Sequence, residues 1–243
     1  MSEHYRDDLA AVRALVRETE VHRDVYTDPD VFALFGGNFN NPNPNLRPEQ
    51  SVGWDAGWEQ KLFNDRAIFD VTYFNTTFKD KIEGVAVPVG PSFFQYVNGI
   101  GAASRRGVEI SNTVQWAPWL STRVVYTYTH AVNSLNQQEV RRAPNSGAFE
   151  IMTAFLENRL KANLRVSYNG VRDDAYYAGW PTGTLRVTLP AYALVRGSVS
   201  YDVTNWATVY VRAENVFNTR YEDTFSYRGA GFAAFAGLKL KYE

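Results

Sequence analysis

The sequence predicts an all-β, antiparallel fold, and three patterns support that prediction. Apolar and polar residues alternate with a period of two in nine segments between residue 51 and the C-terminus, as expected for strands with one apolar face. The connections between these segments alternate between short turns and long loops. Charged residues gather on the polar face of each predicted strand. Together the patterns predict an antiparallel transmembrane β-barrel of outer-membrane type, present in part, with about nine or ten strands.

The nine predicted strands follow one another along most of the chain. The clearest is RLKANLRVSYN, residues 159–169, where apolar and polar side chains alternate without a break. The least clear is FEIMTAFLE, residues 149–157, which is apolar on both faces. The other seven begin near residues 52, 67, 107, 122, 192, 209 and 231.

The N-terminal residues leave two alternatives open. LAAVRALVRET has the apolar spacing of an amphipathic helix, whereas EVHRDVYTD alternates weakly, as a strand would. We therefore divide the chain into residues 1–25, helix or strand, and residues 26–243, the barrel portion.

The lengths of the connections favour a membrane barrel over a soluble β-protein. Short turns are expected at 64–66, 117–120, 157–159 and 204–206, and long loops at about 80–103, 131–146, 170–190 and 219–229. Outer-membrane barrels have short periplasmic turns and long extracellular loops. A soluble sandwich has no reason to place every long loop at one rim. The apolar face is therefore expected to meet lipid.

The polar face of the predicted strands is expected to line the lumen. Burying its charges in a protein core would cost more than a domain's net stability, so they need water or a polar plug. An amphipathic sheet with its polar face in water is the alternative, and Trp and Tyr at strand ends argue against it. The predicted lumen-facing residues are Arg159, Lys161, Arg165, Arg196, Arg212 and Glu214.

Composition excludes several classes of protein. The 243-residue chain has a net charge of -1, which does not favour a nucleic-acid partner. It has no cysteine, so thiolate metal sites and disulfides are excluded. Aromatic residues make up 15% of the chain, and both strands and membrane interfaces favour them. The charged N-terminus does not resemble a secretory signal.

Aromatic residues in the predicted long loops are the best ligand candidates. Exposed aromatics reduce solubility, whereas they can stack on a planar or catecholate ligand. The candidates are Phe93, Phe94, Tyr96, Tyr176, Tyr177, Trp180, Phe225 and Tyr227.

Other loop residues offer weaker chemistry. Asp173 and Asp174 could bind calcium, although adjacent loop carboxylates are more often solvated. The pairs Arg105-Arg106 and Arg141-Arg142 could bind lipopolysaccharide phosphates or an anionic chelate, or be ordinary rim charges. His130 and Ser134 lack the spacing of a hydrolase site. We predict no enzyme activity, no catalytic residue, no cofactor and no metal site.

Three stretches of the sequence resemble the TonB-dependent outer-membrane receptors. They are FGGNFNNPNPNLRPEQSVGWDAGWEQ at 35–60, YVNGIGAASRRGVEISNTVQW at 96–116 and AENVFNTRYED at 213–223. Their order and spacing resemble the family's from about residue 26 to 243, and the cobalamin and siderophore receptors most of all.

The resemblance implies a fold, a location and a function. A barrel of about 22 strands would be plugged by an N-terminal domain and lie in the bacterial outer membrane. It would take up a metal chelate, a siderophore or cobalamin, with the TonB complex, the plug domain, lipid and lipopolysaccharide as partners. We expect this chain to be a fragment without plug or signal peptide. A small self-closed porin-like channel and a soluble β-barrel ligand-binding protein are the alternatives.

Overall fold

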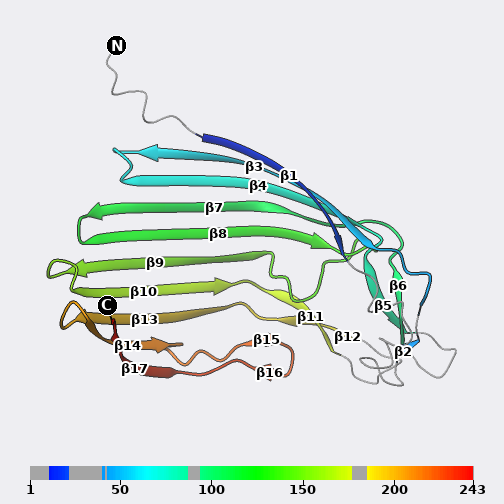
Figure 1. The fold of residues 1–243 in the computed structure, drawn as a ribbon. Coiled ribbons are helices and arrows are strands. Elements are labelled where there is room, and N and C mark those ends of the chain that lie inside the picture. The colour runs from blue at the N-terminus through cyan, green and yellow to red at the C-terminus, as the bar shows by residue number, and fades with distance from the viewer. Residues whose placement is uncertain (1–10, 22–39, 42, 87–93, 177–184, 243) are drawn as a thin grey trace, which may run out of the picture.

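The fold is built around one large antiparallel sheet (Figure 1). The computed structural model describes residues 11–21, 40–41, 43–86, 94–176 and 185–242. Ten strands pair in the order β1-β3-β4-β7-β8-β9-β10-β13-β14-β17, and every neighbouring pair is antiparallel. The described residues contain no helix that could cross a membrane. The all-β, antiparallel prediction is confirmed.

All nine predicted strands belong to this sheet. The sheet strands are β1 (Ala11–Val21), β3 (Glu49–Leu62), β4 (Ala67–Lys79), β7 (Ala103–Ala117), β8 (Leu120–Val132), β9 (Asn145–Phe155), β10 (Leu160–Asn169), β13 (Tyr192–Asp202), β14 (Ala207–Glu214) and β17 (Ala233–Leu240).

The tenth strand, β1, covers the segment for which the sequence left helix and strand open. It pairs with β3 over its whole length, from Ala11 opposite Glu59 to Val21 opposite Glu49. The helical spacing of this segment is a local preference, whereas the edge of β3 offers a row of backbone hydrogen bonds that only a strand can use. The helix suggested by LAAVRALVRET is therefore wrong for residues 11–19, and the part of EVHRDVYTD beyond Val21 lies outside the described residues.

Short turns and long loops lie at opposite rims of the sheet, as predicted (Figure 1). Two of the short turns place three consecutive residues in the left-handed region: residues 63–65 between β3 and β4, and residues 156–158 between β9 and β10. Such turns reverse the chain within a few residues and leave little backbone outside the membrane.

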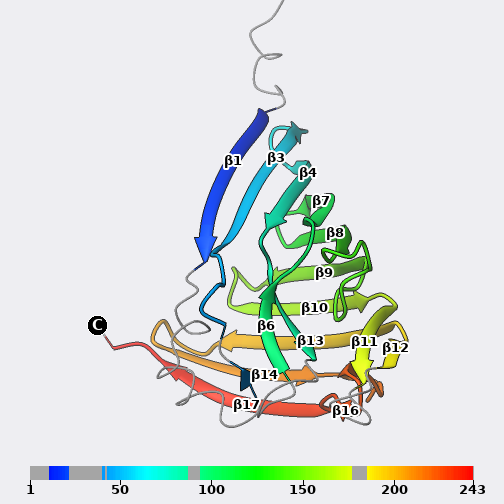
Figure 2. The same ribbon diagram turned by 90° about the vertical axis from the view of Figure 1, so that its right-hand side faces the viewer.

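The sheet is one curved layer, with β1 and β17 as its two edges (Figure 2). These edges are not hydrogen-bonded to each other, so the described residues form a trough and not a closed barrel. Few apolar side chains are buried, and most of them, such as Leu46 and Leu189, lie near the long-loop rim. Large apolar side chains remain exposed along the strands; Val199 and Leu238, for example, are 49% and 60% exposed. Such a surface suits lipid and not water.

Aromatic side chains form two bands on the apolar face. Near the loop rim, Trp54 contacts Tyr73 with ring centroids 5.3 Å apart. Near the turn rim, Trp119 stacks on Phe155 at 5.4 Å, and Trp206 is also exposed. Bands of this kind mark the two membrane–water interfaces of a transmembrane barrel.

Candidate functional site

Small β-structures occupy the long loops, and they build the candidate site at the loop rim. They are β2 (Asn40–Asn41), β5 (Ile82–Ala86) and β6 (Phe94–Asn98), which form a three-stranded sheet, and the hairpins β11 (Arg172–Tyr176) with β12 (Leu185–Leu189) and β15 (Glu222–Thr224) with β16 (Tyr227–Arg228). Ionic contacts join these hairpins to the loop between β8 and β9.

Asp174 is the central residue of these contacts. Its side chain is 0% exposed, and one carboxylate oxygen accepts hydrogen bonds from the Arg141 guanidinium and the Ala175 amide, each at 2.7 Å. The other oxygen accepts the Phe225 amide at 2.7 Å. One buried carboxylate therefore joins the β8–β9 loop, the β11–β12 hairpin and the β15–β16 hairpin.

The pKa of Asp174 reflects these contacts. Burial by itself raises the pKa of this carboxyl. The amides of Phe225 and Ala175 and the guanidinium of Arg141 stabilise the charged form and outweigh burial, so the pKa of Asp174 lies below its ordinary value. The carboxylate is thus charged at neutral pH and holds the three loops together.

Arg172, on the same hairpin, makes a second connection to the β15–β16 hairpin. Its side chain is almost fully buried, lies 3.2 Å from the Asp223 carboxylate and donates a hydrogen bond to the Glu222 carbonyl. Its guanidinium also lies 5.2 Å from the ring centroid of Tyr192, whose hydroxyl donates to Asp223. A planar guanidinium can make all of these contacts at once.

A third group of charges surrounds Glu139 in the β8–β9 loop. Its carboxylate forms an ion pair with Lys81 and lies within 3.7 Å of Arg105 and 3.9 Å of Arg142. Beside it, Arg186 binds the Asp173 carboxylate at 2.8 Å.

A pocket of about 550 Å³ opens between these groups. Its charged lining comprises Lys81, Glu139, Arg142, Asp174 and Arg186. Asn133, Gln137 and Gln138 add amide groups, and the Gln138 side-chain nitrogen is buried without a hydrogen-bond partner among the described residues. The pocket thus offers donors and acceptors at the long-loop rim for a polar ligand rich in oxygen atoms.

The structure brings some of the predicted aromatic residues together and separates others. Tyr176 and Phe225 meet edge to face, with ring centroids 5.1 Å apart, above the Asp174 contacts. Tyr227 is highly exposed on the β15–β16 hairpin, whereas Tyr96 lies on β6 within the three-stranded sheet. The backbone of Phe94 begins β6. Phe93, Tyr177 and Trp180 lie outside the described residues.

The contacts of the described residues do not support a calcium site at Asp173 and Asp174 or a hydrolase site at His130 and Ser134. Asp173 and Asp174 bind different arginines; the side chain of Asp174 is fully buried, whereas that of Asp173 is 28% exposed. In the described part of the chain, no group of three or more His, Cys, Asp or Glu could hold a metal ion. The Ser134 hydroxyl donates to Glu83 at 2.7 Å and has no contact with His130.

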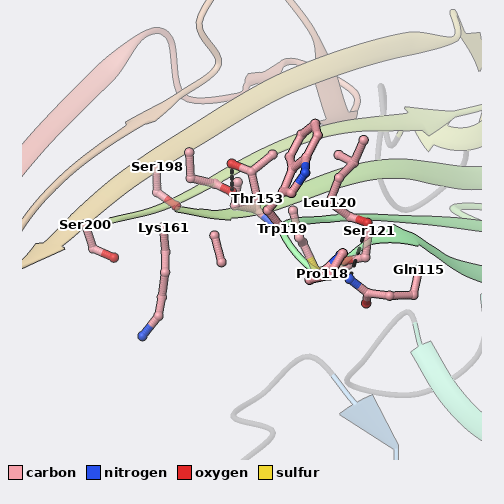
Figure 3. Close-up of a pocket in the computed structure, with 13 residues that line it drawn as sticks. Gln115, Pro118, Trp119, Leu120, Ser121, Thr153, Lys161, Ser198 and Ser200 are labelled. Carbon is pink, nitrogen blue, oxygen red and sulfur yellow. Dashed lines mark hydrogen bonds between the residues drawn. The ribbon is translucent and has the colours of Figure 1, made fainter. Parts of the chain in front are cut away.

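The concave face of the sheet is the second feature of the site. Figure 3 shows Lys161 and Ser200 projecting to one side of the sheet and Trp119 to the other. The polar residues Gln115, Lys161, Asn163, Ser198 and Ser200 line a depression of about 380 Å³ at its turn end.

Ion pairs on this face involve most of the predicted lumen-facing residues. Lys161 lies 3.5 Å from Asp202, Arg165 lies 3.7 Å from Glu150, and Arg212 lies 3.5 Å from Glu214. Arg196 lies directly opposite Arg165 in the register.

Arg159 is placed differently from the other five. It lies in the turn before β10, and its guanidinium donates to the carbonyls of Asp202 and Val203 in the neighbouring turn, at 3.0 and 2.9 Å. The period of two that the sequence suggests begins one residue later, at Leu160. Arg159 therefore connects two turns at the short-turn rim of the sheet.

A ten-stranded sheet with an apolar convex face, a charged concave face, aromatic bands and ordered loops at one rim defines the wall of a transmembrane β-barrel. Comparison with known proteins identifies the family of this barrel. The family described as TonB dependent receptor-like, beta-barrel, matches residues 24–216, and the chain belongs to that family.

Relatives and solved structures agree with this assignment. The chain is 29% identical over 215 residues to the vitamin B12 transporter BtuB of Vibrio cholerae serotype O1, covering 88% of this chain and 33% of the relative. It superposes on the siderophore receptor PirA of Acinetobacter baumannii with a TM-score of 0.78 at 16% identity, covering 98% of this chain and 40% of that one.

A third similarity is to a receptor solved with its ligand. The ferripyoverdine receptor of the outer membrane of Pseudomonas aeruginosa, bound to ferripyoverdine, gives a TM-score of 0.73 at 15% identity, covering 95% of this chain and 31% of that one. At these identities the solved structures show a shared fold. The chain spans about a third of the length of the curated relatives it matches.

Sequence reasoning missed the ionic connections between the loops. The residues were visible as charges, but Arg141 and Asp174 are 33 positions apart and Asp174 and Phe225 are 51 apart. The local signals were the Asp173-Asp174 pair, which suggested calcium or solvent, and the Arg141-Arg142 pair, which suggested a phosphate or an anionic chelate.

Proposed function

We propose that this chain forms wall strands and extracellular loops of an outer-membrane receptor that takes up a metal chelate, a siderophore or cobalamin, with energy supplied through TonB. The polar concave face lines the route and contacts the plug domain, while the connected loops receive the ligand. The single observation that carries the proposal is the two-faced sheet with its family match over residues 24–216.

The pocket at the loop rim supports a chelate as the ligand. Three cationic side chains, Lys81, Arg142 and Arg186, outnumber the two carboxylates of Glu139 and Asp174 in its lining, and neutral amides complete it. This combination suits a ligand that presents several oxygen atoms. Tyr176 and Phe225, the predicted aromatic candidates that meet each other, add an apolar surface on the adjacent hairpins. The other predicted aromatic residues remain part of the proposal as further ligand contacts.

Direct binding tests this function. The chain is refolded in detergent, and binding of a ferric catecholate, a ferric hydroxamate and cobalamin is measured by equilibrium dialysis. We expect one class to bind, and the double substitution Arg142→Gln with Arg186→Gln to weaken that binding at least tenfold, since charged hydrogen bonds are worth about 1.5–3 kcal/mol each. The control is Arg123→Gln, which lies far from the pocket on β8.

The outcomes separate the parts of the proposal. Equal binding by the double variant and the control would exclude the pocket as the ligand site. Failure of all three chelates to bind the folded chain would remove chelate capture from the function of this segment. Folding to a compact monomer in plain buffer, without detergent, would contradict the membrane role itself.

A further inference from the structure

Arg106 lies on the apolar face of the sheet, unlike the charged side chains that the structure describes between its level and the turn rim. It shares that face of β7 with Val108, Ile110, Val114 and Trp116, because the positions differ by multiples of two. Among the side chains that the structure describes, this face carries no other Lys, Arg, Asp or Glu between the turn rim and the level of Arg106. One exposed cation therefore interrupts a surface built for lipid.

The cross-strand register gives Arg106 specific neighbours. It lies opposite Asn75 on β4 and His130 on β8, and Asn75 lies opposite Trp54 on β3. This row, Trp54–Asn75–Arg106–His130, is defined here as the rim row. The next row toward the turn rim consists of Tyr73, Val108 and Tyr128, and its two tyrosines lie at the level of the aromatic band near the loop rim.

The preceding residue, Arg105, shows how different the position of Arg106 is. Arg105 points to the concave side, where it lies 3.7 Å from the Glu139 carboxylate and 6.0 Å from the Phe78 ring. Arg106 is exposed and makes no hydrogen bond or ion pair within the described residues. The Arg-Arg pair is thus divided between the two faces of the wall, and of the two only Arg105 has an ionic partner among the residues that the structure describes.

The depth of Arg106 indicates what it meets. It lies ten positions from Trp116, an exposed residue of the same strand at the level of the aromatic band near the turn rim. At about 3.3 Å per residue this is about 33 Å along the strand, and a tilt of about 40° reduces it to a height of about 25 Å. The apolar band of an outer-membrane barrel is also about 25 Å tall. Arg106 therefore lies at the level of the outer-leaflet headgroups.

We propose that the rim row is a binding site for the phosphate-bearing headgroup of an outer-leaflet lipid of the lipopolysaccharide type. The Arg106 guanidinium can form a two-pronged hydrogen bond with a phosphate, which it also neutralises. The Asn75 amide and the His130 ring supply further donors, and Trp54 packs against the lipid below the headgroup. The membrane orientation rests on the proposed function, but the site does not depend on chelate binding.

The site lies within the sheet, on strands β3, β4, β7 and β8, none of which is an edge strand. It therefore forms whether or not β1 and β17 find partners, and the chain itself can be tested. The refolded chain is captured from mixed micelles that contain bisphosphorylated lipid A, and the retained lipid is quantified by mass spectrometry. The matched variants are Arg106→Gln on the convex face and Arg123→Gln on the concave face; heat-modifiable gel migration reports folding.

We expect Arg106→Gln to weaken lipid retention about tenfold, the loss typical for a charged hydrogen bond, and Arg123→Gln to leave it unchanged. Dephosphorylated lipid A should bind the unaltered chain as weakly as the phosphorylated lipid binds Arg106→Gln. If Arg106→Gln does not fold, Arg106→Lys keeps the charge without the two-pronged geometry and should still show a measurable loss.

Two results would overturn the inference. Equal retention by the Arg106 and Arg123 variants would show that the rim row does not recognise the headgroup. Complete displacement by inorganic phosphate at an equal concentration would show a site for free phosphate instead of a lipid. Loss of chelate binding with lipid retention intact would count against the proposed uptake function alone.

Discussion

Replacing Asp174 with Asn should release the β15–β16 hairpin from the rest of the loop rim. The carboxylate has two oxygens, and they accept the amides of Ala175 and Phe225 and the guanidinium of Arg141. An Asn side chain has one oxygen and an NH₂ group, so one of the two amides then faces a donor. The side chain of residue 174 is fully buried, so water does not readily replace the lost acceptor.

The expected loss of free energy follows from the number of hydrogen-bond partners that Asp174→Asn removes. A buried donor left without an acceptor costs about 1–3 kcal/mol. Arg141 is 48% exposed and can be hydrated again, so its lost ion pair adds little. We therefore expect local opening of the hairpin to become easier by about 2 kcal/mol, which corresponds to about thirtyfold faster amide exchange.

Native-state hydrogen exchange of the Phe225 amide in detergent measures this effect. The control is Asp173→Asn, on the adjacent residue, which binds Arg186 and Thr188 and makes no contact with the β15–β16 hairpin. Asp173→Asn should leave Phe225 exchange within about threefold of the original rate, in line with a surface ion pair. Equal acceleration by the two variants, or none by Asp174→Asn, would refute the central role of Asp174.

The remaining predictions concern pH, the lipid-facing surface and a close approach of two strands. Because the pKa of Asp174 is depressed in the folded state, its contribution to stability is fully present above the ordinary value of 3.8 and is lost as the pH falls through the folded-state value. The protection of the Phe225 amide from hydrogen exchange, corrected for the intrinsic rate at each pH, should therefore fall in that acidic range. Val195→Lys, farther from the turn on the convex face of β13, should lower the free energy of unfolding in vesicles by about 2–4 kcal/mol, and Ser198→Lys on the concave face by much less. Equal losses would contradict the assigned faces. Gly107→Ala places a methyl 2.0 Å from a backbone oxygen of β8 and should cost about 1–3 kcal/mol, whereas Gly197→Ala meets nothing closer than 3.5 Å and should cost under about 1 kcal/mol in urea titrations.

The strands and their faces could be predicted because both depend on residues that are close in sequence. In a strand, successive side chains point to opposite sides, so Lys161 and Leu164 reveal their faces through their immediate neighbours. The turns expected at 64–66 and 157–159 were equally visible, since short polar segments between two strands leave few conformations. Arg159 shows the limit of this reasoning: the alternation includes it, but the turn extends through Arg159 and β10 begins at Leu160.

The loop rim was decided by tertiary structure alone. β1 is a strand because it pairs with the edge of β3, although the apolar spacing of its own sequence favoured a helix. The burial of Asp174 as a charged side chain depends on Arg141, 33 positions away, and on the Phe225 amide, 51 positions away. Charge attraction between such residues acts only after the sheet has brought their loops to the same rim. The sequence specifies the alternation within a strand directly, whereas the proximity of residues far apart in the chain depends on the completed fold.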